Sequence, residues 1–121
     1  MTKKYTIEVT EKQAYVMRDA LEVLSRLQIG QVWAATDNLP SDSNKVRDWD
    51  MQKALEAAYE PFEPASYKHS PTSEIAWDLY TVIRHRLAWD NNPQGGISVS
   101  FDSPMQHGSE PLADIKAAND E

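Results

Sequence analysis

The chain has 121 residues, a formal net charge of −7 and no cysteine. This length fits one domain of ordinary size. The lack of cysteine excludes disulfides, thiolate metal ligands and a cysteine nucleophile, and the acidic balance argues against binding nucleic acid or an anionic membrane through the whole surface. No apolar run approaches the roughly 20 residues of a membrane-spanning helix, and we expect no leader segment.

A strand is the first element expected along the chain. Residues 4–10 carry apolar side chains at Tyr5, Ile7 and Val9, with polar side chains between them. This alternation is typical of a strand with one buried face. We therefore expect a strand that leads directly into the next element, a helix.

The first helix is expected over residues 11–29. Thr10 and Gln13 have the spacing of a capping box, in which each side chain pairs with the other's backbone amide. Apolar residues at three- and four-residue steps then follow and form one stripe. Gly30 stands where a left-handed C-terminal cap is favoured, so the helix should end just before it.

A second helix is expected after a polar loop. Residues 36–44 have the composition of a loop, and Ser43 or Asn44 can cap a helix that runs to about residue 59. Prolines after that point end the helix, because proline disrupts helical hydrogen bonding. Residues 60–71 therefore read as a connection.

The third helix has the clearest start. Ser70 is a good N-cap and Pro71 suits the first helical position, so a helix should run from there to about residue 89. Residues 90–96 are rich in Asp, Asn, Pro and Gly, which is turn composition. Residues 97–101 alternate again and predict a second strand.

These elements predict an α+β fold in the order β-α-α-α-β. The two terminal strands most simply pair antiparallel with each other against the three helices, within one chain or across a subunit interface. Residues 1–104 are the expected globular domain. Residues 105–121 are polar and read as a flexible C-terminal tail.

One side of the third helix carries the main candidate ligand residues. Trp77, Tyr80 and Arg84 share this side, and Arg86 adds a second guanidinium near the helix end. Aromatic rings can stack a base, and arginine can grip a phosphate with two hydrogen bonds. The alternative is that the rings pack under other helices and the arginines pair with nearby carboxylates.

Further candidates lie at other points of the chain. Arg26 offers a cation at the end of the first helix, Trp89 a third aromatic ring, and Asn91 and Asn92 amides that could read base edges. Tyr67 could close over the ligand. The alternative interpretation of Arg26 is a cation that simply neutralises the helix C-terminus.

No catalytic or metal-binding motif accompanies these residues. The three histidines have no metal-ligand spacing, and neither a phosphate-binding loop nor a nucleophile elbow is present. No pair of carboxylates is marked out for acid–base work. We therefore expect no cofactor, no metal and no enzymatic activity.

A set of short segments carries a recognisable pattern: residues 8–13, 25–26, 30–31, 65–67, 77–78, 82–85, 87–89, 92–93, 95–96 and 101–104. This pattern resembles a family of small, mostly uncharacterised phage-encoded proteins. The most specific part is the run over residues 77–104, and the family pattern has glycine where this chain has Lys68. The resemblance implies a phage origin, a host-cytoplasmic setting and an action against host defences.

The resulting hypothesis is a non-enzymatic binding protein that sequesters a small nucleotide-like signal of host defence. We expect it to be a homodimer or a higher homo-oligomer. The alternative is an acidic protein inhibitor that binds and blocks a host defence or DNA-binding protein. Neither function needs a membrane or direct contact with nucleic acid.

Overall fold

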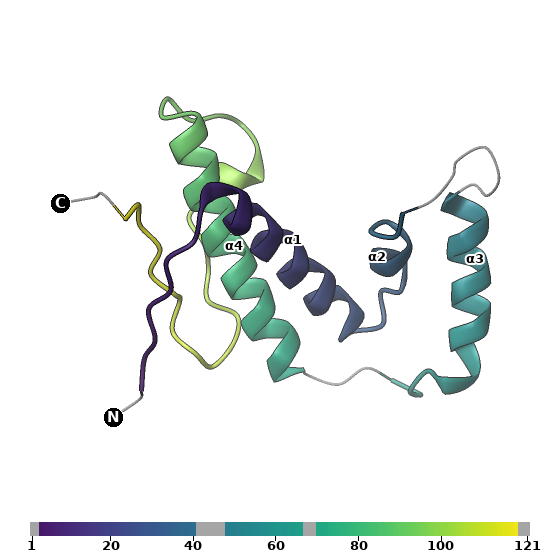
Figure 1. Cartoon of the computed structure of the whole chain (residues 1–121). Helices are drawn as coiled ribbons and strands as arrows, with labels where there is room; N and C mark the ends of the chain where they lie inside the picture. The colour runs from purple at the N-terminus through teal and green to yellow at the C-terminus, as the bar shows by residue number, and fades with distance from the viewer. Residues whose placement is uncertain (1–2, 41–47, 67–69, 119–121) are drawn as a thin grey trace.

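The computed structural model describes residues 3–40, 48–66 and 70–118, and its regular elements are all helical (Figure 1). The chain order is α1, α2, α3, a 3-10 turn η1, α4 and a second 3-10 turn η2. Their bounds are Glu11–Leu27, Trp33–Thr36, Asp48–Tyr59, Glu60–Phe62, Pro71–Asn91 and Val99–Phe101.

The predicted α+β fold is wrong, because the described residues contain no strand. Residues 4–10 run without a turn or bend, as a strand would. The backbone of residues 4–9, however, makes no hydrogen bond within the described part of the chain. Extended backbone becomes a sheet only when a second strand supplies hydrogen-bond partners, and the second predicted strand does not do so.

The predicted strand over residues 97–101 is replaced by local contacts. The Ser98 side chain accepts a hydrogen bond from the backbone N–H of Ser100, which starts the turn η2. Side-chain bonds of this kind compete with sheet ladders for the backbone. The indole of Trp89 then donates to the carbonyl of Phe101 at 3.1 Å, and the two rings meet edge to face. This segment is thereby fixed on α4.

The start and end of α1 follow from local signals that the sequence carries. The predicted capping box is confirmed, since Thr10 and Gln13 each accept from the other's backbone N–H. The helix ends at Leu27. Gly30 has a φ of 85°, so the predicted left-handed residue after the helix is also confirmed.

Helix α4 begins as predicted and packs antiparallel to α1. Ser70 caps it through the N–H of Ser73, and Pro71 is the first helical residue. Ser25 near the end of α1 and Ser73 near the start of α4 each donate from the hydroxyl to the other's carbonyl at 2.8 Å. At the opposite ends of these helices, Asn91 donates to the hydroxyl of Tyr15.

The core lies between α1 and α4. Ala14, Ile83 and Leu87 are its buried residues, and each is 6% exposed. Met17, Leu21 and Ile115 are among the partly buried side chains that pack against this group. Because Ile115 belongs to residues 105–118, the segment predicted to be a flexible tail contributes to the core.

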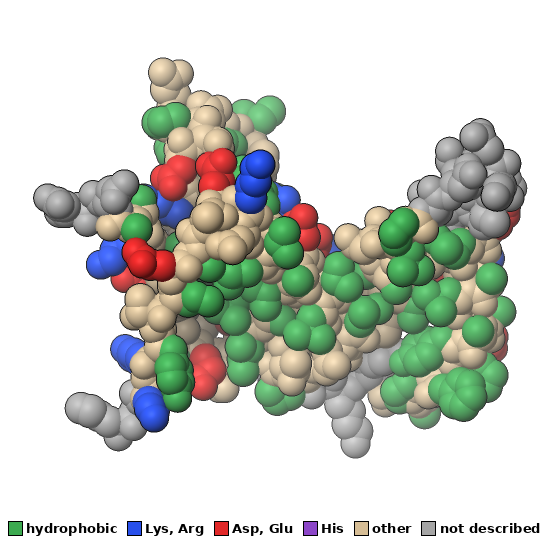
Figure 2. Space-filling model, in the orientation of Figure 1, with side chains coloured by type: hydrophobic (Ala, Val, Ile, Leu, Met, Phe, Trp, Pro, Cys, Tyr) green, Lys and Arg blue, Asp and Glu red, His purple; other side chains and the backbone are tan. Residues whose placement is uncertain are grey.

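Helix α3 stands apart from the α1–α4 pair (Figure 1). Among the described elements it packs against α2 and η1, and not against α1 or α4. The predicted start of this helix at Ser43 or Asn44 lies outside the described residues. Figure 2 shows hydrophobic side chains spread over the visible faces of α1, α2 and α3. No described helix combines the length and apolarity that crossing a membrane requires.

Candidate functional site

Three of the predicted ligand residues form a contiguous group on α4. The rings of Trp77 and Tyr80 lie 4.9 Å apart between centroids and are tilted by 53°. The guanidinium of Arg84 lies 4.9 Å from the centre of the Tyr80 ring, and its Nη1 donates to the Tyr80 hydroxyl at 3.2 Å. These residues stand at helical spacing on one side of α4, as the sequence predicts.

Arg26 joins this group from a different helix. Its guanidinium lies 5.2 Å from the centre of the Trp77 ring and 4.9 Å from the centre of the Trp33 ring. It therefore contacts the indoles of both α4 and α2. The guanidinium also donates to Glu22 at 3.2 Å and to the side-chain oxygen of Gln31 at 3.1 Å.

The turn after α1 brings Trp33 to Arg26. The N–H of Gln31 donates to the carbonyl of Arg26 at 2.9 Å, and Gly30 between them has a positive φ. This reversal directs the chain back toward the end of α1, so that α2 starts beside it. We call the resulting set the aromatic–arginine row, defined by Trp33, Arg26, Trp77, Tyr80 and Arg84.

Arg84 has an unusual electrostatic position in this row. Its Nε atom is buried and has no hydrogen-bond partner in the part of the chain that the structure describes. Within the described residues, no carboxylate lies in ion-pair distance of it. By contrast, Arg18 pairs with Asp19 and Arg26 pairs with Glu22. Burying a charge without a partner is unfavourable, so this guanidinium can still gain energy from an added anion.

The rings of the row differ in their accessibility. Tyr80 is only 8% exposed, so its face cannot take a stacked ligand and its hydroxyl instead supports Arg84. Trp33 and Trp77 are partly exposed, which leaves indole surface for contact. The row therefore combines partly exposed indole rings with a buried tyrosine beneath the Arg84 guanidinium.

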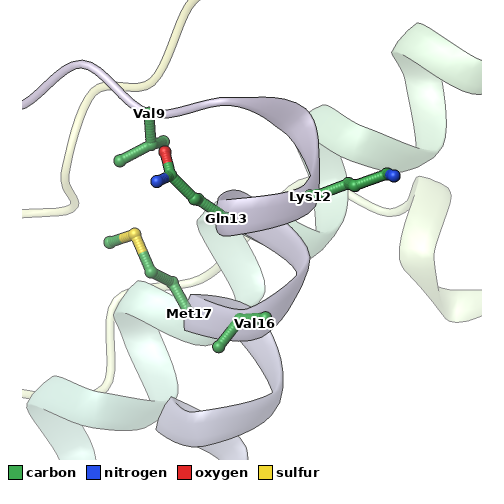
Figure 3. Close-up of a pocket in the computed structure, with 5 residues that line it drawn as sticks. All are labelled: Val9, Lys12, Gln13, Val16 and Met17. Carbon is green, nitrogen blue, oxygen red and sulfur yellow. The ribbon is translucent and has the colours of Figure 1, made fainter.

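Two hollows of the described surface are lined by residues outside this row. The larger one, of about 390 Å³, is open and apolar, and Val9, Val16 and Met17 contribute to its lining (Figure 3). A smaller one, of about 60 Å³, lies between α4 and residues 110–113. A ligand of the row would therefore lie across its side chains and not inside either hollow.

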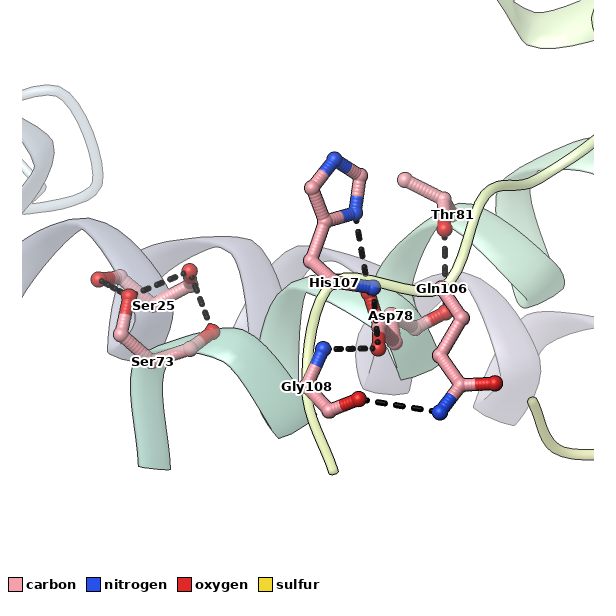
Figure 4. A network of polar contacts seen from close by, with 7 residues as sticks. All are labelled: Ser25, Ser73, Asp78, Thr81, Gln106, His107 and Gly108. Carbon is pink, nitrogen blue, oxygen red and sulfur yellow. Dashed lines mark hydrogen bonds and ion pairs between the residues drawn. The ribbon is translucent and has the colours of Figure 1, made fainter. Parts of the chain in front are cut away.

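Asp78 lies on α4 as well, and its carboxylate has hydrogen-bond partners within the chain (Figure 4). The residue is 5% exposed. Its carboxylate accepts from the backbone N–H of His107 at 3.0 Å and from that of Gly108 at 2.9 Å. The Nδ1 of His107 lies 3.1 Å from the same carboxylate. These bonds attach the C-terminal segment to α4.

The other predicted ligand residues do not join the row. Near the end of α4, Arg86 pairs with Asp90 at 3.0 Å, and Trp89 contacts Phe101. Further along, Asn91 donates to Tyr15 and Leu87, and Asn92 donates to the Gly95 carbonyl. Tyr67 lies outside the described residues.

Trp33 is the row residue that was not predicted from the sequence. A four-residue helix has too little periodicity to be seen in a sequence, and a loop was expected shortly after it. The available signal was its position three residues after a glycine that reverses the chain. Within the described residues, no group of His, Asp and Glu has the arrangement of a metal site.

Comparisons with family profiles, with curated proteins and with solved structures gave no match for this chain.

Proposed function

We propose that the protein binds a small, planar, anionic ligand of nucleotide-like chemistry at the aromatic–arginine row, without changing it chemically. The observation that carries this proposal is the state of Arg84. Its guanidinium is stacked on Tyr80, its buried Nε has no partner among the described residues, and no described carboxylate neutralises it. A phosphate at the Nη groups would supply the missing negative charge.

Each residue of the row would contact a different part of the ligand. Arg84 would hold a phosphate through the guanidinium hydrogens that Tyr80 does not use. The partly exposed indole of Trp77 would contact the face of the base, since base–aromatic stacking contributes about 1–3 kcal/mol. Arg26 would approach a second anionic group, in competition with its present partner Glu22.

The wider role that we propose is sequestration of a nucleotide signal of host defence by a phage-derived protein. It rests on the resemblance of residues 77–104 to small phage-encoded proteins and on the chemistry of the row. A sequestering protein needs affinity and shielding but no reactive group. The proposal therefore requires that the ligand be recovered intact.

The first experiment measures the melting temperature of the purified protein with a panel of cyclic and linear nucleotides. Each ligand is then extracted and its integrity checked by mass spectrometry. A ligand that binds only the folded state raises the melting temperature, and the stabilisation grows with the logarithm of the ligand concentration divided by the Kd. Arg84→Gln removes the candidate cation, and Arg86→Gln on the same helix is the matched control, because Arg86 already pairs with Asp90.

We expect a nucleotide to stabilise the wild type and the Arg86→Gln variant. Arg84→Gln should weaken its binding at least about tenfold, which corresponds to about 1.4 kcal/mol. A panel without any shift contradicts the proposed ligand class. An altered nucleotide after extraction would instead indicate an enzyme.

The α3 end of the molecule favours a second candidate function, which is binding to a host protein. Trp49, Phe62 and Leu39 are 56%, 81% and 54% exposed in this region. Exposed aromatic residues of this kind often anchor protein interfaces. In that case Trp49→Ser or Phe62→Ser would abolish binding to the host protein, Arg84→Gln would not, and added salt would slow the association of this acidic chain.

A further inference from the structure

The N-terminal segment is extended, and its backbone makes no hydrogen bond with the rest of the described chain. Residues 4–9 run straight, and none of their N–H or C=O groups is hydrogen-bonded there. Their apolar side chains are also uncovered, since Tyr5 is 84% and Ile7 71% exposed. An alternating segment with both edges open is suited to pair with another extended chain.

The charges along this segment favour one partner and one direction. Lys4 lies at its start, directly after Lys3, and Glu8 lies near its end, before Glu11 at the start of α1. A second copy in antiparallel orientation places the lysines of each chain near the glutamates of the other. A parallel copy would place like charges side by side, which is unfavourable.

A two-fold axis through Thr6 gives a register in which the pairs nearest the axis are complementary. Lys4 then lies opposite Glu8 of the second copy, and Tyr5 lies opposite Ile7. Opposite charges and aromatic with β-branched residues are both favourable cross-strand pairs. The apolar pairs share one face because side chains alternate along extended backbone.

The larger hollow lies beside the end of this segment. Val9 belongs to both, and Val16 and Met17 of α1 continue the apolar surface (Figure 3). Val16 is 68% exposed, although it lies on a helix that packs against the core. A second copy paired along residues 4–9 would bring apolar side chains to this surface.

The chain also exposes more surface area than a compact monomer of its mass does. Its accessible area is 9329 Å², whereas a compact monomer of 13.7 kDa exposes about 6,600 Å². The excess of about 2,700 Å² is larger than the roughly 1,000–2,500 Å² that one subunit of an obligate homodimer covers.

We propose that two copies of this chain associate through residues 4–9, antiparallel about an axis at Thr6. This contact pairs the first predicted strand with its own copy, whereas the sequence predicted pairing with the strand over residues 97–101. It is independent of the proposed ligand site. It makes residues 4–9 a specific homodimer interface.

Cross-linking in a glutathione redox buffer tests the register, because the natural chain has no cysteine. Thr6→Cys places two thiols opposite each other, within the Cα separation of about 4.4–6.8 Å that a disulfide needs. Glu8→Cys is the matched control in the same segment, since its two copies would lie about 14 Å apart. Ser109→Cys is an exposed control elsewhere.

We expect Thr6→Cys to yield at least about tenfold more disulfide-linked dimer than either control, which corresponds to about 1.4 kcal/mol in pairing free energy. Equal cross-linking of the three variants overturns the proposal. So does a wild type that sediments as a monomer up to its highest soluble concentration. A wild-type dimer whose Thr6→Cys variant does not cross-link is held by another surface and also overturns it.

Charge reversal tests the pairing without a cross-link. Lys4→Glu or Glu8→Lys alone should weaken the dimer about tenfold, because each change creates two like-charge pairs about the two-fold axis. The double variant restores opposite charges and should recover the wild-type dimer. A double variant as weak as the single ones contradicts the register, while circular dichroism confirms that each variant keeps its helices.

Discussion

Asp78 and Arg84 lie on the same helix, but their charged groups differ in the partners that the chain supplies. The Asp78 carboxylate accepts two backbone N–H groups and faces the His107 ring, so its bonding capacity is used by residues 107–108. The Arg84 guanidinium has the Tyr80 hydroxyl and ring as its neighbours, and its Nε has no partner among the described residues. Both side chains are at least partly buried.

This difference separates a structural charge from one that is available to a ligand. A buried charge is tolerated when the chain supplies its partners, because the hydrogen bonds offset the loss of hydration. Asp78 meets this condition and fastens a segment that is distant in sequence. Arg84 does not, which is why its removal should affect stability little and anion binding strongly.

Removal of Asp78 is expected to have the largest effect on stability. Asp78→Ala leaves the N–H groups of His107 and Gly108 without their acceptor and releases the C-terminal segment. The free energy of unfolding should fall by about 2–3 kcal/mol, as for hydrogen bonds to a charged group. Urea unfolding measures this change, and Asp90→Ala, which removes an exposed ion pair, is the control with a loss below about 1 kcal/mol.

The serine pair that joins α1 to α4 should rank second. Ser25→Ala removes the bond to the Ser73 carbonyl and leaves the buried Ser73 hydroxyl with one partner fewer. A loss of about 1–2 kcal/mol is expected in the same urea experiment. Ser109→Ala, on an exposed residue, should change stability very little, and an equal loss in both variants would refute the role of the pair.

Gly30 tests the Arg26 end of the row with a smaller effect. Gly30→Ala should cost about 1 kcal/mol, because a side chain at a φ of 85° is strained. Gly30→Asn should cost less, since asparagine tolerates this conformation better than alanine does. Thermal unfolding distinguishes the two variants. Equal losses would show that the turn does not depend on its backbone conformation.

The helices α1 and α4 could be predicted because their signals are local. Thr10 with Gln13 and Ser70 with Pro71 act within one helical turn of their own chain. The predicted strand at residues 97–101 failed because its outcome depends on Trp89, which lies on another element. The strand over residues 4–10 failed because the described part of the chain supplies no partner strand, although its extended backbone agrees with its alternating sequence.

The candidate site could be predicted only along one helix. Trp77, Tyr80 and Arg84 share a face of α4 at a spacing that the sequence shows directly. The approach of Arg26 and Trp33 depends on the reversal at Gly30, which is a three-dimensional property of the turn. The sequence also cannot show that Tyr80 is buried while Trp77 is partly exposed, because this depends on how α1 and α4 pack.

The stability of Arg84→Met tests whether the Arg84 charge is free of a structural role, and this measurement needs no ligand. Methionine keeps the apolar length of the side chain and removes the charge that lacks a partner. Since replacing such a charge is close to neutral and the contact with Tyr80 contributes little, the free energy of unfolding should stay within about 1 kcal/mol of the wild type. A loss of more than about 2 kcal/mol, comparable with that of Asp78→Ala, would mean that Arg84 is a structural charge and is not held available for an anionic ligand.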